Sequence, residues 1–109
     1  MKAKIRRRYL ALEIDSKEKI GQKELMDAIW DAVLRLYGEY GASKTGLALI
    51  EHDAEKNLAI IRAAHTETEK IRAAIATITE IATKPAAIRI LTVSGTLKAL
   101  RRRIRAKYA

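Results

Sequence analysis

The chain has 109 residues, no cysteine and a formal net charge of +9. This length suits a single domain, residues 1–109, built around one hydrophobic core. The lack of cysteine excludes disulfides, thiolate metal sites and thiol nucleophiles. No apolar run approaches the ~20 residues that span a bilayer, and the basic N-terminus lacks the apolar stretch of a secretory signal. We therefore expect a cytoplasmic protein that does not bind membranes.

Positive charge is concentrated at both ends of the sequence. Residues 1–12 carry five basic residues and no acid, and residues 81–109 carry eight basic residues and no acid. The segment between them, residues 13–80, holds nine basic and 13 acidic residues, a net charge of −4. Such asymmetry is typical of a protein that binds a polyanion. The alternative is a pair of solubilising tails, and it is weaker for the second segment because that segment is amphipathic.

The first part of the chain predicts a strand followed by a long helix. Residues 8–15 alternate between two faces, as in a strand with one apolar side. From residue 23 to about residue 38 the apolar residues recur at helical spacing. The main apolar stripe of this helix is Leu25, Ile29, Val33 and Leu36. Gly38 and Gly41 are expected to end the helix.

The middle of the chain predicts a hairpin and a second helix. Residues 47–52 and 57–63 read as strands joined by a turn at residues 53–56. The helix that follows is expected to begin near His65, with Thr66 as its N-cap and Glu69 completing a capping box. Its apolar stripe is Ile71, Ile75, Ile78 and Ala82. Lys84-Pro85 is expected to stop it, because the residue before proline avoids helical angles.

Residues 86–93 predict a fourth strand, in which period-two alternation separates two faces. One face would hold Ile88, Ile90 and Thr92, and the other Arg89, Leu91 and Val93. The resulting order β-α-β-β-α-β is the ferredoxin-like arrangement, which RRM domains share. We therefore predict an α+β, RRM-like domain with a four-stranded antiparallel sheet, two helices on one face, and a basic C-terminal helix.

The C-terminal helix carries two stripes. Leu97, Leu100 and Ile104 form an apolar stripe, which predicts docking on a core. A fully cationic stripe lies beside it, formed by Lys98, Arg101, Arg102 and Arg105. Like charges at this spacing weaken an isolated helix, so a negatively charged partner is expected. Ser94 and Thr96 are candidate N-caps.

The long first helix has more apolar surface than one sheet face needs. Met26, Trp30 and Tyr37 are the surplus. One interpretation is that they reach around the edge of the core. The other is a protein partner, because exposed Trp, Tyr and Met are enriched at interface centres.

The sequence argues against base stacking and against a protein active site. Tyr9 is the only aromatic residue of the first strand, and residues 57–63 contain none, so the RNP1 pattern is absent. If the protein binds nucleic acid, its contacts should therefore go to phosphates. Glu51, His52 and Asp53 could form a metal or acid–base cluster, but a solvated turn is the favoured interpretation. We expect no cofactor or metal bound by the protein.

Three stretches together carry a resemblance to a known family. They are residues 7–11 (RRYLA), residues 28–41 (AIWDAVLRLYGEYG) and residues 92–103 (TVSGTLKALRRR), the last being the most specific. In order and spacing the sequence resembles the Pop-five family shared by archaeal and eukaryotic ribonuclease P, and within it the archaeal component 2 proteins. Residues 53–86 are diverged and support only the fold.

The resemblance implies a subunit of the ribonucleoprotein that removes the 5′ leader from precursor tRNA. In that enzyme the RNA is the catalyst and binds Mg²⁺, and the protein would meet precursor tRNA only indirectly. The implied protein partner is the TIM-barrel subunit, component 3, with which family members form a heterotetramer. A free-standing module that binds the RNA phosphate backbone, without a role in tRNA processing, is the alternative.

The site residues follow from the charge pattern and the resemblance together. The predicted RNA-binding residues are Arg6, Arg7, Arg8, Ser94, Thr96, Lys98, Arg101, Arg102, Arg103, Arg105 and Lys107. The predicted partner interface is Met26, Trp30 and Tyr37. For Ser94 and Thr96 a plain strand-to-helix cap is the equal alternative to a helix terminus that binds a phosphate.

Overall fold

A computed structural model of the protein describes residues 6–108, and the side chains of residues 6–106. The elements are β1 (Arg7–Ser16), α1 (Gln22–Ser43), β2 (Ala48–Asp53), β3 (Leu58–Ala64), a 3-10 turn (His65–Glu67), α2 (Thr68–Ala76), β4 (Glu80–Ile81), β5 (Lys84–Ser94) and α3 (Leu97–Tyr108). The strands form an antiparallel sheet in the order β2-β3-β1-β5-β4. The α+β class is confirmed. The strand count is wrong, because the two-residue strand β4 adds a fifth strand beside β5.

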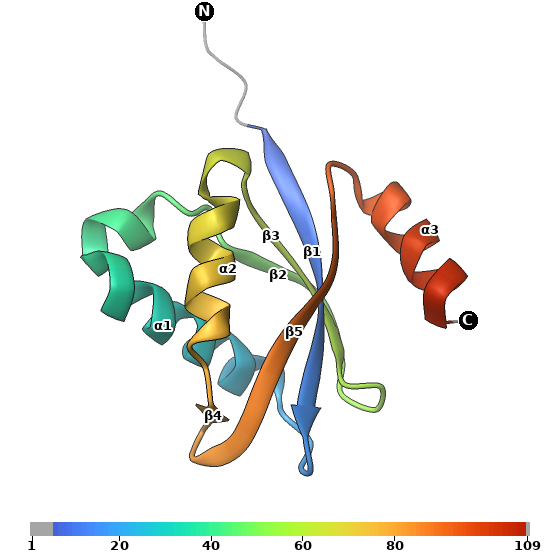
Figure 1. Ribbon diagram of the computed structural model, residues 1–109, viewed down its shortest axis with the longest axis horizontal. Coiled ribbons are helices and arrows are strands. Elements are labelled where there is room, and N and C mark those ends of the chain that lie inside the picture. The colour runs from blue at the N-terminus through green and yellow to red at the C-terminus, as the bar shows by residue number, and fades with distance from the viewer. Residues whose placement is uncertain (1–5, 109) are drawn as a thin grey trace, which may run out of the picture.

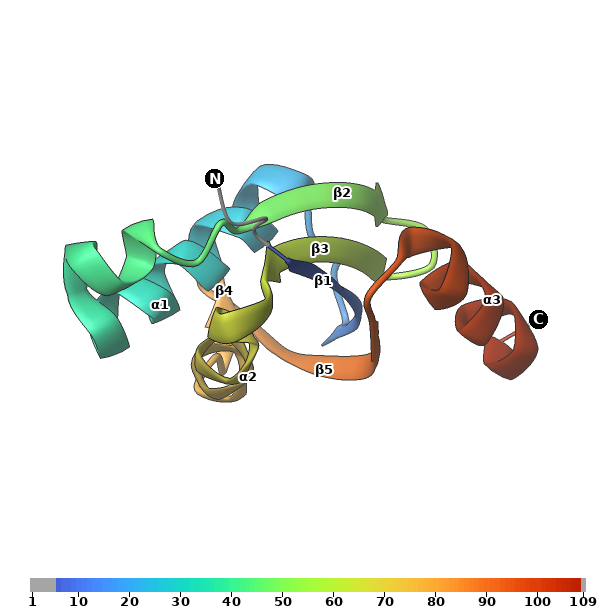
Figure 2. The same cartoon turned by 90° about the horizontal axis from the view of Figure 1, so that it is seen from above.

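Helices cover both faces of this curled sheet. Figures 1 and 2 show α1 and α2 on one side and α3 on the other. The first side encloses the main core, where Leu10, Leu12 and Ile14 of β1 meet buried residues of α1 and α2. The second side holds a smaller cluster of Ala11, Ile60 and Leu100, which we call the α3 cluster. Alternate side chains of β1 therefore belong to two separate cores, one on each face of the sheet.

Helix α1 runs further than predicted, with a break at Gly38. The backbone of Gly38 has φ 71° and ψ 178°, a conformation that only glycine adopts readily. Helical structure then resumes and continues to Ser43. Leu36 was expected in the core stripe, but it is 46% exposed, whereas its neighbour Tyr37 packs against the main core.

Helix α2 is shorter than predicted at both ends. Thr66 is not its N-cap: residues 65–67 form the 3-10 turn, and Glu67 precedes α2 without a side-chain cap bond. The helix ends at Ala76, well before Pro85, which lies inside β5. Ile78 is buried in the loop that follows, and Ala82 and Thr83 make the tight β4–β5 turn with positive φ angles of 50° and 69°.

An extra residue in β5 changes which side chains face the main core. Leu12 pairs with Ile90 but Ala11 pairs with Thr92, so Leu91 is a β-bulge. Beyond the bulge, Val93 packs on the main core together with Ile90, whereas Leu91 packs on the α3 cluster. The strict alternation predicted for this strand is wrong from residue 92 onward.

Candidate nucleic-acid interface

The two basic segments of the sequence meet at one end of the sheet. In the antiparallel register of β1 and β5, Tyr9 pairs with Ser94. The beginning of β1, with Arg7 and Arg8, therefore lies beside the end of β5, from which α3 departs (Figure 1). Residues about 90 positions apart in the chain share one surface because the strands run antiparallel.

Helix α3 docks through its apolar stripe, as predicted. Leu100 is fully buried against Ala11 and Ile60, and Leu97 and Ile104 are half-buried around it. The backbone at the start of the helix is also tied down. Thr96 is the N-cap: its Oγ1 accepts the Ala99 N–H at 3.2 Å. The Thr96 N–H donates to the Oγ of Ser94 at 3.3 Å, so both predicted capping hydroxyls are engaged at the strand–helix junction.

The cationic stripe of α3 faces solvent. Lys98, Arg101, Arg102 and Arg105 are all exposed. Arg101 reaches Glu51 of β2 at 3.5 Å, a long contact on an exposed surface that contributes little. Among the described residues, Lys98, Arg102 and Arg105 have no hydrogen-bond or ion-pair partner. Three neighbouring cations without counter-charge produce a local positive potential that attracts phosphates.

Arg103 differs from its neighbours. Its Nη1 donates a 2.6 Å hydrogen bond to the carbonyl oxygen of Val93 in β5. This bond links the second turn of α3 back to the strand that precedes it. The side chain of Lys107, also predicted to bind RNA, lies outside the described side chains.

The N-terminal arginines also differ in whether they are exposed or bonded within the protein. Arg6 and Arg7 are exposed at the beginning of β1. Arg8 is half-buried, and its Nε donates to the Nδ1 of His65 at 2.9 Å. Its Nη1 lies 2.5 Å from the point that a Cβ on Gly95 would occupy, so the guanidinium lies directly against the β5–α3 junction. Sequence reasoning missed His65, because 57 residues separate it from Arg8 and no local pattern links them.

The predicted partner residues lie at the rim of the main core. Met26, Trp30 and Tyr37 are half-buried and pack against it, so one side of each remains accessible. The most exposed large apolar residues of α1 are others: Leu34 at 42%, Leu36 at 46% and Tyr40 at 67% exposed. Leu34 could have been found from the sequence, because it belongs to neither apolar stripe of α1.

The acidic residues and histidines of the described region do not gather into a metal-binding group. None of the groups of His, Asp and Glu in this part of the chain has three members placed to hold a metal ion. Asp27 and Asp31, on the solvent side of α1, pair with Lys23 and Arg35, each at 3.2 Å. No helix in the described region has both the length and the apolar character needed to cross a bilayer.

Comparison with known proteins agrees with this geometry. The model of the Rpp14/Pop5 family matches residues 8–105, which include most of β1, the β5–α3 junction and most of α3. A chain in the cryo-EM structure of yeast ribonuclease MRP has the same fold, with a TM-score of 0.71 over 98% of this chain and 95% of that chain. The two sequences are 20% identical, so this likeness is one of fold.

Two curated relatives are similar to this chain over most of their length. The ribonuclease P protein component 2 of Pyrococcus furiosus is 31% identical over 94% of this chain and 86% of the relative. That of Pyrococcus horikoshii is 36% identical over 93% of this chain and 84% of the relative. The chain therefore belongs to the Rpp14/Pop5 family, the family of these ribonuclease P protein subunits.

Proposed function

We propose that this protein, as component 2 of an archaeal ribonuclease P, binds and stabilises the RNA of that ribonucleoprotein. The RNA cleaves the 5′ leader from precursor tRNA, and the protein supports its folded form. The observation that carries the proposal is the gathering of both basic segments at one end of the sheet, with the cations of Lys98, Arg102 and Arg105 directed to solvent.

The mechanism is neutralisation of phosphates where RNA strands pack closely. Folded RNA brings phosphates together, and their repulsion must be balanced by Mg²⁺ or by protein cations. A docked helix already holds in place the backbone that carries these cations, so less backbone freedom is lost when RNA binds. The protein would then lower the Mg²⁺ concentration that the RNA needs, while binding no metal itself. The contacts are to phosphates, which position the RNA without reading its sequence.

The proposal also covers the protein partner and the cellular location. We infer that the accessible sides of Met26, Trp30 and Tyr37 receive the TIM-barrel subunit, component 3, in a heterotetramer. Precursor tRNA would be met only through the assembled particle, in the cytoplasm. The order of the four long strands, β2-β3-β1-β5, supports a ferredoxin-like, RRM-like classification with β4 added at its edge.

Reconstitution tests the function. The protein is combined with its cognate ribonuclease P RNA and the TIM-barrel subunit, and cleavage of precursor tRNA is followed across a Mg²⁺ titration. We expect omission of the protein to raise the Mg²⁺ midpoint. The double variant Arg101→Ala, Arg102→Ala should raise it in the same direction while the fold, followed by circular dichroism, is unchanged.

A charge-matched control separates location from total charge. Lys17→Ala with Lys23→Ala also removes two exposed positive charges, but from the β1–α1 loop and the start of α1. This control should leave the Mg²⁺ midpoint near that of the unaltered protein. If both double variants shift it equally, α3 has no special role. If omission of the protein changes nothing, the free-standing phosphate-binding module becomes the better account.

A further inference from the structure

The guanidinium of Arg8 is held in a defined position by two neighbours. On one side, the Nδ1 of His65 accepts a hydrogen bond from Nε at 2.9 Å. On the other side, the backbone of Gly95 approaches so closely that a Cβ there would lie 2.5 Å from Nη1. These neighbours come from the 3-10 turn and from the β5–α3 junction, so Arg8 lies between two elements that β1 brings together.

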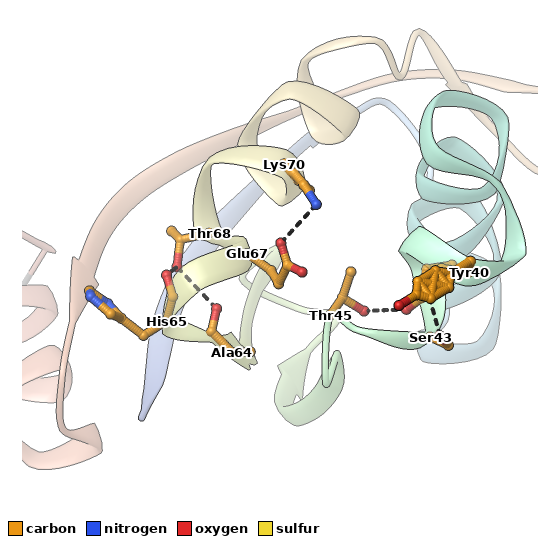
Figure 3. A network of polar contacts seen from close by, with 9 residues as sticks. Tyr40, Ser43, Thr45, Ala64, His65, Glu67, Thr68 and Lys70 are labelled. Atoms are coloured by element: carbon orange, nitrogen blue, oxygen red, sulfur yellow. Dashed lines mark hydrogen bonds and ion pairs between the residues drawn. The ribbon is translucent and has the colours of Figure 1, made fainter. Parts of the chain in front are cut away.

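The backbone of His65 is itself well anchored. Its N–H donates to the carbonyl of Arg6 at 2.8 Å, and its carbonyl accepts the hydroxyl of Thr68 at 3.0 Å. Figure 3 shows the imidazole pointing away from this network and from the Glu67–Lys70 ion pair. The backbone that carries the imidazole is therefore fixed, although His65 itself is exposed to solvent.

We propose that His65 is a positioning residue for RNA binding: it orients the Arg8 guanidinium at the β5–α3 junction so that its Nη groups meet an RNA phosphate. This inference rests on the proposed function. An arginine that donates a hydrogen bond from Nε still has four N–H groups, on Nη1 and Nη2, with which to bind another group. That end of the guanidinium forms the planar fork that pairs with two phosphate oxygens.

The direction of the Arg8–His65 hydrogen bond determines which ring nitrogen of His65 must be unprotonated. Arg8 can only donate, so Nδ1 must carry a lone pair, and in the neutral ring the proton is then on Nε2. Asparagine can replace this function, because its side-chain oxygen is an acceptor at nearly the same distance from the backbone as Nδ1. Alanine offers no acceptor and leaves the long Arg8 side chain free to rotate.

A substitution at Gly95 would displace the Arg8 guanidinium without changing His65. A methyl group there would meet the end of a flexible side chain, so the guanidinium would move and the backbone would stay. Gly95→Ala should therefore displace Arg8 without disturbing the helix that follows. The inference predicts that the effects of His65→Ala and Gly95→Ala are not additive, because both act through Arg8.

The experiment measures affinity for the cognate ribonuclease P RNA by filter binding, with a melting curve for each variant as a check of folding. We expect Arg8→Ala and His65→Ala each to weaken binding by roughly threefold to tenfold. His65→Asn should bind within about twofold of the unaltered protein. In the Arg8→Ala background, His65→Ala should have no further effect. Thr66→Ala, at the exposed neighbouring position, is the matched control.

A spectroscopic reading on the free protein tests the contact without RNA. The Nε–H resonance of Arg8 in a ¹⁵N spectrum should stand apart from the other arginines in the unaltered protein and in His65→Asn. It should merge with them in His65→Ala and Gly95→Ala.

The outcomes separate this inference from the function on which it rests. If Arg101→Ala with Arg102→Ala weakens RNA binding but His65→Ala does not, the inference is overturned and the proposed function stands. Equal losses in His65→Asn and His65→Ala would also overturn it, because the acceptor would then be irrelevant. If neither the α3 variant nor Arg8→Ala weakens binding, the proposed function itself fails.

Discussion

At the scale of single residues, two adjacent arginines of α3 have different surroundings. Arg102 is exposed and has no partner among the described residues, whereas Arg103 donates to the carbonyl of Val93 at 2.6 Å. One residue is a 100° step around a helix, so neighbours in sequence face different directions. Arg102 is thus free for a phosphate, and Arg103 holds the helix to the sheet.

This difference predicts two separable phenotypes. Arg102→Ala should weaken RNA binding, lower the slope of log affinity against log salt by about one, and leave the melting temperature unchanged. Arg103→Ala should lower the free energy of unfolding by about 1 kcal/mol, since a charged donor leaves a carbonyl. Filter binding across a salt series and thermal melting measure the two effects. Equal melting losses in both variants would contradict the assignment.

What the sequence could predict at this scale depended on local spacing. Leu97, Leu100 and Ile104 were identified because a helix repeats every 3.6 residues, and the structure places them against the sheet. The Arg8–His65 contact depends on how β1 lies beside the 3-10 turn, and the Arg103–Val93 contact depends on how α3 folds back on β5. Each contact joins two different elements, so residue spacing within one element did not reveal it.

At the scale of elements, α1 shows how one glycine divides a helix. The angles of Gly38 lie in a region where a side chain is strained, yet apart from the adjoining backbone no heavy atom lies within 4 Å of where a Cβ would be. Any cost of adding a methyl group is therefore backbone strain and not a clash. The break allows the last turns of α1 to lead into the buried Thr45 and β2.

We expect Gly38→Ala to lower the free energy of unfolding by about 1–3 kcal/mol. Chemical denaturation measures this value. Glu39→Ala is the control, because Glu39 is the exposed residue that directly follows Gly38 in the same helix. A Gly38→Ala protein as stable as the control would mean that α1 can straighten at no cost.

The start of α1 has a pH-dependent stabilising contact. The Gly21 N–H bond at 3.1 Å and the Lys84 ammonium at 3.3 Å hold the pKa of the Glu24 carboxyl below its usual value of 4.5. A carboxyl whose pKa is lowered by folding stabilises the folded state above its unfolded pKa. That contribution is lost as the pH falls through the folded pKa.

Glu24→Gln should therefore destabilise the protein at neutral pH, and the difference from the unaltered protein should shrink as the pH falls below 4.5. Urea unfolding at several pH values measures it. Glu39→Gln, an exposed carboxyl of the same helix, should show no such trend. A constant difference for Glu24→Gln at all pH values would exclude the ionised contact as its cause.

The errors in the predicted elements also have physical causes. Thr66 and Glu69 have the spacing of a capping box, but the chain leaves β3 through a 3-10 turn, where Thr68 bonds to the carbonyls of Ala64 and His65. Ile78 and Ala82 were predicted to continue the apolar stripe of this helix, but Ile78 is buried in the loop after α2 and Ala82 is exposed in the β4–β5 turn. Periodicity alone cannot tell a helix from a loop or a short strand that covers the same core.

At the scale of the whole molecule, the sheet separates two cores of unequal size. The main core involves α1, α2 and the strands, whereas the α3 cluster, within the part of the chain that the structure describes, has Ala11, Ile60 and Leu100 as its only buried members. Among the described residues, the apolar attachment of the cationic helix thus consists of one buried leucine and its half-buried neighbours. Its stability should be lower than that of the rest of the fold.

Leu100→Ala should accordingly loosen α3 and spare the main core. The opening free energy of α3 amides should fall by about 2 kcal/mol or more, while amides of β1 and β3 keep their protection. Hydrogen exchange read by mass spectrometry resolves the two regions. Ala99→Ser, at the half-buried neighbouring position, controls for substitution in this turn. Equal loss of protection in both regions would show that the two cores unfold together.

The bulge at Leu91 determines the side of the sheet from which the chain leaves β5. Each residue along a strand turns the next side chain to the opposite face, so one residue fewer between Arg89 and Ser94 would exchange the two faces at the junction. The polypeptide would then enter α3 on the side already occupied by α1 and α2. In alignments of relatives that carry this helix in the same place, gaps should therefore fall outside the segment from Arg89 to Ser94, even where its side chains differ.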